Sequence, residues 1–193
     1  MQLTQGVEWA VHCLVVLAFL PPHATLPAVR LAEYHGVPHP YLAKALQALA
    51  SAGIVTSVPG RHGGYRLSRR ATQITLLDVV RAVDEPDALF RCTEIRRRGP
   101  ASVPASGYPP VCAIAAAMDR AESAWRAELE RTTIAELADQ VRRQAPAAAL
   151  EKSRRWLDAT LGVGTSPSRP RPRARRAQPA GSGGPSRVRR SST

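Results

Sequence analysis

Two pairs of residues in this chain have side chains that could bind a metal or carry out redox chemistry. Glu8 and His12 are four positions apart in an expected N-terminal helix, so both side chains leave the same face. This pair can be a surface ion pair or two ligands of one metal, and the spacing alone favours the ion pair. Cys92 and Cys112 bracket a long proline-rich segment. Their spacing is not that of a zinc finger, so alone they are an incomplete metal site, inert thiols or a pair that can oxidise.

The expected N-terminal helix runs from about Thr4 to Phe19, with an apolar stripe at spacings of three and four. The stripe comprises Leu3, Val7, Ala10, Val11, Leu14 and Ala18. Cys13 also lies on this helix, but it points about 100° away from His12. That angle argues against Cys13 joining a site that contains His12.

The segment Thr25–Arg70 predicts two short helices followed by a tight β-hairpin. The first helix spans roughly Pro27–His35, and the second begins near Pro40 and is closed by Gly53. Two β-type runs, 54–58 and 65–67, then flank a glycine-rich turn. A mainly α winged helix-turn-helix is the predicted fold. The alternative is a helical hairpin with an ordinary β-turn and no ligand.

The side chains at the tips of this unit suit double-stranded DNA. His39, Tyr41 and Lys44 fall at the N-terminal end of the second helix, where a recognition helix meets base edges in the major groove. Arg61 and His62 lie between glycines at the tip of the hairpin, where a cation can approach phosphates or the minor groove. We therefore predict these five residues as the DNA-binding set.

Charge is unevenly distributed along the 193 residues. The formal net charge is +12, and residues 165–193 contain eight arginines and no acidic residue. This tail is rich in Pro, Gly and Ser, a composition that favours disorder. It could hold DNA without sequence preference through counterion release, or it could be a solubilising extension.

An apolar run at residues 9–20 raises the question of a membrane or export segment. The run is too short to span a bilayer, and no basic residue precedes it. We interpret it as a buried helix and expect a cytoplasmic protein with no membrane partner. Cysteines stay reduced in that compartment, so we expect no structural disulfide among the three.

A long helix is predicted from Cys112 to about Glu130. Apolar residues recur along it at steps of three and four: Ile114, Met118, Ala121, Trp125 and Leu129. A tryptophan-bearing stripe outside the winged unit suggests packing against a second copy, although packing within the chain's own domain is compatible with it. Thr133 and Glu136 form a capping-box pattern that opens a further helix, and 147–161 could add another.

These elements divide the chain into four expected parts. Residues 1–84 form a winged helix-turn-helix DNA-binding domain, and 85–112 form a ligand-bearing loop. Residues 113–145 form the long dimerisation helix and its successor. Residues 146–193 are a C-terminal extension that is disordered from about 165.

Residues 1–144 resemble the IscR/NsrR-type (BadM/Rrf-type) winged-helix iron–sulfur regulators, which are bacterial homodimers. The resemblance is carried by short segments, which are 6–10 (GVEWA), 41–44 (YLAK), 63–67 (GGYRL), 74–80 (ITLLDVV), 92–96 (CTEIR) and 121–125 (AESAW). It implies a transcriptional regulator that senses through an iron–sulfur cluster. The chain departs from the family in two places: Pro38-His39-Pro40 replaces the usual serine before the recognition helix, and three closely spaced cysteines are missing.

In lacking three closely spaced cysteines, the chain resembles the RsrR type within this family. In that type a [2Fe-2S] cluster is held by two cysteines, a histidine and a glutamate and is shared between subunits. The resemblance assigns these roles to Glu8, His12, Cys92 and Cys112. It also implies redox-coupled roles for Trp9 and His35.

The resulting hypothesis is a redox-sensing, homodimeric DNA-binding regulator with a [2Fe-2S] cluster. Two alternatives keep the fold but not the cluster: a switch through a Cys92–Cys112 disulfide, and a response to a small effector or partner protein. An enzyme with Cys13 or Cys92 as nucleophile lacks any nucleophile–base or phosphate-loop signature, so we predict no enzymatic activity.

Overall fold

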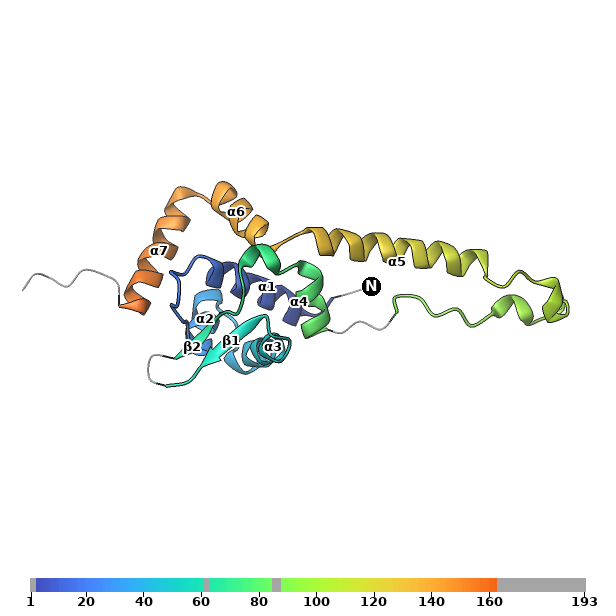
Figure 1. Ribbon diagram of the computed structural model, residues 1–193, viewed down its shortest axis with the longest axis horizontal. Coiled ribbons are helices and arrows are strands. Elements are labelled where there is room, and N and C mark those ends of the chain that lie inside the picture. Colours follow the sequence, from blue (N-terminus) through green and yellow to red (C-terminus); the bar gives the residue numbers. More distant parts are fainter. Residues whose placement is uncertain (1–2, 61–62, 85–87, 163–193) are drawn as a thin grey trace, which may run out of the picture.

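The computed structural model describes residues 3–60, 63–84 and 88–162, and it is mainly helical (Figure 1). A single two-stranded antiparallel sheet accompanies the helices in this part of the chain. The elements in chain order are α1 (Gln5–Ala18), α2 (Ala28–His35), α3 (His39–Ser51), β1 (Val55–Val58), β2 (Gly64–Leu67), α4 (Leu76–Val83), α5 (Ala113–Arg131), α6 (Ile134–Gln144) and α7 (Ala147–Leu161).

Helix α1 is the central element, because it packs against α3, α4 and α6. Because helices cover several sides of α1, more of its residues are buried than the single predicted apolar stripe contains. Cys13, Val16 and Leu17 are therefore buried although the predicted stripe omits them. Val11 and Ala18, which the stripe includes, are only half-buried.

Helices α2 and α3 form the predicted helix-turn-helix. Gly36 ends α2 in the left-handed conformation, with φ of 65°. The inner face of α3 consists of four buried apolar residues at helical spacing: Leu42, Ala45, Leu46 and Leu49. Pro38 is the N-cap of α3 and makes no side-chain capping hydrogen bond, so the helix begins without the bond that a serine could accept.

The wing is the β1–β2 hairpin, with Val55 opposite Leu67 and Val58 opposite Gly64. The Leu26 and Tyr65 backbones extend it through two N–H···O hydrogen bonds of 3.0 and 2.9 Å. A Cβ on Gly64, whose φ is +150°, would lie 2.4 Å from the Leu26 carbonyl carbon. Glycine is required there because the two backbones approach so closely. Arg61 and His62, at the predicted wing tip, lie outside the described residues.

Helices α4 and α6 begin beside each other. Thr75 and Thr133 each cap a helix through a capping box, and the one predicted at Thr133 is confirmed. The Leu76 N–H donates to the Thr132 carbonyl at 2.9 Å, and the Ile134 N–H donates to the Ile74 carbonyl at 2.9 Å. These bonds fasten the C-terminal helices to the winged unit.

Helix α5 extends away from the body of the molecule, and the segment before it lies on the same side (Figure 1). The helix has no buried residue within the described chain. The N-terminal part of the predicted stripe is open to solvent, with Ile114 64% and Met118 40% exposed, whereas Trp125 and Leu129 are half-buried. Among the described helices, none is both long and apolar enough to cross a bilayer. The predicted mainly α winged-helix fold is confirmed.

Candidate sensing and DNA-binding sites

The exposed face of α1 carries Glu8, Trp9 and His12 on neighbouring turns. Glu8 and His12 are both exposed, and Trp9 is half-buried. Within the described chain no ion pair joins Glu8 to His12, so the simple ion-pair interpretation receives no support. We call this surface the α1 sensing face, because the sequence predicts a sensing role for its residues.

His12 on this face lies against His35 at the C-terminal end of α2. The two imidazole centroids are 5.7 Å apart and the rings are tilted by 59°. His35 Nε2 is buried and has no hydrogen-bond partner among the described residues. Burial, and secondarily the nearby His12, lower the pKa of His35 to about 4. His35 is therefore neutral at physiological pH.

Trp9 on the same face lies against the recognition helix. Its ring centroid is 6.4 Å from that of Tyr41 on α3, in an edge-to-face arrangement of 63°. The two side chains help to line a groove of about 700 Å³, which Lys44 and Asp84 also border. The α1 sensing face thus contacts both helices of the helix-turn-helix.

Cys92 and Cys112 lie around one guanidinium in the segment that precedes α5. The hydrogen bond and charge of Glu94, and after them the charges of Cys112 and Cys92, raise the pKa of the Arg96 guanidinium. Arg96 pairs with Glu94 at 2.8 Å, and Cys92 Sγ lies 3.9 Å from Glu94 Oε1. Cys92 is thus linked through Glu94 to Arg96, which in turn bonds to Pro109, three residues before Cys112.

The position of Arg96 is fixed by the far end of the loop. Its guanidinium donates to the Pro109 carbonyl at 2.9 Å and lies 5.1 Å from the centroid of the Tyr108 ring. The Tyr108 hydroxyl donates in turn to the Arg96 carbonyl at 2.6 Å. Sequence reasoning missed Arg96 and Tyr108, because a basic run in a long loop gives no sign of which arginine folds inward.

The cysteines differ in their chemistry. Cys112 is the N-cap of α5, and the backbone N–H groups of Ala115 and Ile114, followed by Arg96, lower the pKa of its thiol. Burial raises the pKa of Cys13 to about 12. Cys112 is thus suited to act as a thiolate ligand or a reactive thiol, and Cys13 is not.

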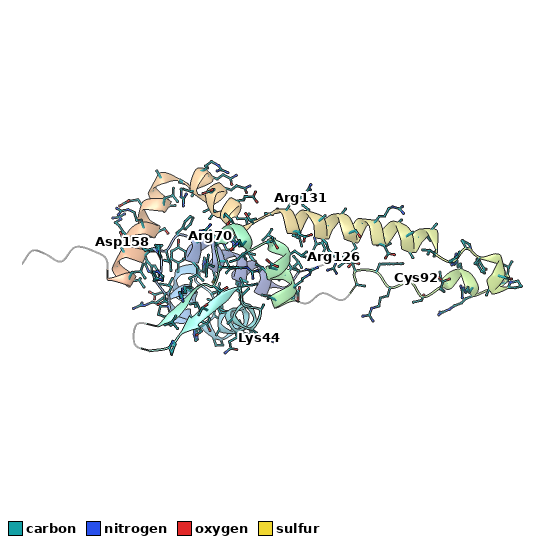
Figure 2. The ribbon with its side chains drawn as sticks, in the orientation of Figure 1. Lys44, Arg70, Cys92, Arg126, Arg131 and Asp158 are labelled. Atoms are coloured by element: carbon teal, nitrogen blue, oxygen red, sulfur yellow. The ribbon has the colours of Figure 1, made fainter. Side chains whose placement is uncertain are left out.

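One chain does not assemble the predicted ligand set. Within the described residues, no group of three or more His, Cys, Asp or Glu side chains could hold a metal ion. Figure 2 shows Cys92 beyond the winged body, on the segment near α5, whereas Glu8 and His12 belong to α1. The donor types fit an iron–sulfur cluster, but they form two separate halves, one carboxylate–imidazole and one dithiol.

The predicted DNA-binding residues on α3 are accessible. Tyr41 is 66% exposed, and His39 and Lys44 are also exposed. Figure 2 shows Lys44 on the outer side of α3. These positions are compatible with a recognition helix that enters a major groove.

The fold and the exposed recognition helix define a winged-helix DNA-binding protein, and comparison with known proteins gives the family. The model of the Rrf2 family, described as an iron-dependent transcriptional regulator, matches residues 3–140. The chain therefore belongs to the Rrf2 family of transcriptional regulators. As a member of this family it is a DNA-binding regulator and not an enzyme, and such regulators typically dimerise.

One curated relative is similar in sequence, and two solved structures are similar in fold. YffB of Lactococcus lactis subsp. lactis (strain IL1403), assigned as an HTH-type transcriptional regulator, is 29% identical over 158 residues, covering 82% of this chain and 98% of YffB. CymR, the global cysteine regulator of B. subtilis, has a similar structure, with a TM-score of 0.59 and 21% identity over 72% of this chain and 98% of CymR. IscR of T. potens has a TM-score of 0.58 and 20% identity, over 76% of this chain and 93% of IscR.

Proposed function

We propose that this protein is a redox-sensing regulator that binds double-stranded DNA as a homodimer and uses a [2Fe-2S] cluster to control operator binding. The ligands would be Glu8 and His12 from one subunit and Cys92 and Cys112 from the other. The observation that carries the proposal is that Cys92 and Arg96 both contact Glu94 in the segment before α5, whereas Cys112 is the N-cap of that helix. A regulator of this kind acts where the chromosome lies, so a cytoplasmic location is part of the proposal.

The separation of the two halves supports the proposed sharing of the cluster between subunits. The α1 sensing face and the cysteine pair do not form a metal-binding group within one described chain. The cysteines sit beside the N-terminal end of α5, and the exposed stripe on that helix offers a surface for a second copy. In a dimer joined through α5, the cysteine-bearing loop of one subunit could approach α1 of its partner.

The residues of this chain supply a route from the ligands to DNA. When bound, the cluster would supply a reversible one-electron change of charge beside α1. His12 touches His35 on α2, and Trp9 touches Tyr41 on α3. A movement of the α1 sensing face would thus reach both helices of the DNA-binding unit, which gives Trp9 and His35 their proposed redox-coupled roles.

The proposal assigns a task to each part of the chain. Residues 1–84 form the DNA-binding domain, with contacts from His39, Tyr41 and Lys44 on α3 and from Arg61 and His62 in the wing. Residues 85–112 carry the thiol ligands, and 113–145 join the subunits. Residues 146–193 form a C-terminal extension.

The ligand set is tested by absorption spectra and iron and sulfide analysis of anaerobically purified protein. Cys92→Ala and Cys112→Ala should give colourless protein, because no other thiol near the site can replace a lost thiolate. Glu8→Ala and His12→Ala should give a labile or spectrally altered cluster. Cys13→Ala is the matched control and should keep the wild-type spectrum, because Cys13 is fully buried in the core.

Two results would refute this ligand set. One is loss of the cluster in Cys13→Ala together with an unchanged spectrum in His12→Ala. The other is a wild-type protein that contains neither iron nor sulfide after anaerobic purification.

The lowered pKa of the Cys112 thiol favours one alternative, a clusterless thiol switch. Oxidation by a peroxide would join Cys92 and Cys112 in a disulfide, and two electrons and two protons would pass to the peroxide and reduce it to water or an alcohol. A colourless protein that loses two free thiols after peroxide treatment, and regains them with a dithiol reductant, would support this alternative.

A further inference from the structure

Helix α7 reaches the α1 sensing face through a chain of aromatic rings. Trp156 of α7 lies 5.1 Å from the ring of Tyr34 on α2, at 63°. Tyr34 in turn lies 4.9 Å from the ring of His35, at 82°. His35 then contacts His12 at 5.7 Å. Four rings thus connect α7 to a proposed cluster ligand.

A hydrogen bond fixes the middle of this chain. The Tyr34 hydroxyl is bonded to the hydroxyl of Ser153, one turn before Trp156 on α7. Tyr34 is therefore held by α7 at two points, its ring and its hydroxyl. A side chain held at two points has little freedom to change rotamer.

His35 depends on these ring neighbours for its position. No hydrogen bond to its buried Nε2 is formed within the described chain. A half-buried imidazole whose buried nitrogen lacks such a directional bond is oriented by packing. The rings that pack on His35 are those of Tyr34, at 82° to it, and His12, at 59°.

Helix α7 is itself anchored to the body of the molecule. Leu157 is 8% exposed and belongs to the main hydrophobic core, and Trp156 and Leu161 pack partly against that core. The helix also lies beyond residue 140, where the match to the family model ends. It is thus a fixed support that the matched segment does not contain.

We propose that α7 is a brace for the α1 sensing face, with Trp156 and Ser153 as positioning residues. They hold Tyr34, and through it His35, against His12. The inference rests on the proposed function, because it concerns the face that carries the proposed ligands. Loss of the contacts between α7 and Tyr34 would change the packing around His12 and the position of α2 in the DNA-binding unit.

The test uses the full chain without cluster and compares Trp156→Ala with Arg155→Ala. Nuclear magnetic resonance of the imidazole Cε1–H groups reports the surroundings of His12 and His35. Trp156→Ala should shift both signals and weaken specific DNA binding at least about fivefold, the lower end of typical couplings between sites. Arg155 is the matched control, because its side chain is 70% exposed on the same helix, and its replacement should change neither measurement.

Two further variants separate the contribution of the Trp156 ring from that of the Ser153 hydrogen bond. Trp156→Phe keeps a ring beside Tyr34 and should return both signals towards wild type. Ser153→Ala removes only the hydrogen bond and should shift them in the direction of Trp156→Ala by a smaller amount. If circular dichroism shows that Trp156→Ala loses helix, Ser153→Ala decides the question.

The brace is refuted if His12 and His35 signals in the deciding variant match those of Arg155→Ala. This outcome is separate from failure of the proposed function. An absence of iron and sulfide in the wild-type protein would refute the cluster and leave the measured coupling between α7 and the two histidines intact.

Discussion

At the scale of single residues, the exposed side chains of α3 and the wing should divide the work of DNA recognition. Tyr41 stands at the N-terminal end of α3, where side chains reach base edges, so Tyr41→Ala should relax the preference at particular base pairs. Arg61→Ala should weaken binding to all sequences and reduce the salt dependence by about one phosphate contact. Gel shifts on operator variants at several salt concentrations measure both effects.

Ser51 provides the control for these variants. It is exposed at the C-terminal end of the same helix, away from the end that enters the groove, so Ser51→Ala should bind as wild type does. Unchanged affinity and salt dependence in both Tyr41→Ala and Arg61→Ala would contradict the assigned roles.

At the scale of elements, the wing depends on a close backbone approach at Gly64. A Cβ there would meet the Leu26 backbone at 2.4 Å, and φ of +150° is unfavourable for any other residue. Gly64→Ala should therefore lower the free energy of unfolding by roughly 1–3 kcal/mol. Urea unfolding measures the loss. Gly60→Ala is the comparison, because its φ of +108° carries strain but its Cβ would meet nothing within 4 Å. An equal loss in both variants would show that backbone strain, and not contact with Leu26, accounts for the lower free energy of unfolding.

The same scale shows how far the sequence alone could go. The inner face of α3 was predictable because its four buried residues repeat at helical spacing on a helix with a polar side. The burial of Cys13, Val16 and Leu17 was not, since α1 is apolar around most of its circumference and only the tertiary packing shows that several helices cover it.

In the candidate site, too, local sequence patterns predicted the residues but not their tertiary contacts. Residue types and family motifs pointed to Glu8, His12, Cys92 and Cys112. The contacts of Trp9 with Tyr41 and of His12 with His35 join elements that are distant in sequence, so no local pattern encodes them. The inward position of Arg96 likewise depends on a carbonyl and an aromatic ring more than ten residues further along the loop.

At the scale of the whole molecule, the exposed stripe on α5 predicts how two subunits join. Ile114 and Met118 are 64% and 40% exposed in one chain, so a charge placed there should leave the fold intact. In a dimer that buries the stripe, the same charge would be desolvated without a partner, at a cost of several kcal/mol. Met118→Glu should therefore give a folded monomer. Trp125 is less informative, because it is already half-buried within its own chain.

Sedimentation velocity and circular dichroism measure the two halves of this prediction. Ser123→Glu is the matched control, because Ser123 is exposed and lies about 140° around α5 from Met118. It should stay dimeric. The monomeric variant should also lose operator affinity, because a single winged unit cannot occupy two half-sites about 34–36 Å apart. A Met118→Glu protein that sediments as a dimer would move the subunit interface away from this stripe, and with it the route by which the cysteines of one subunit could reach a different subunit's α1.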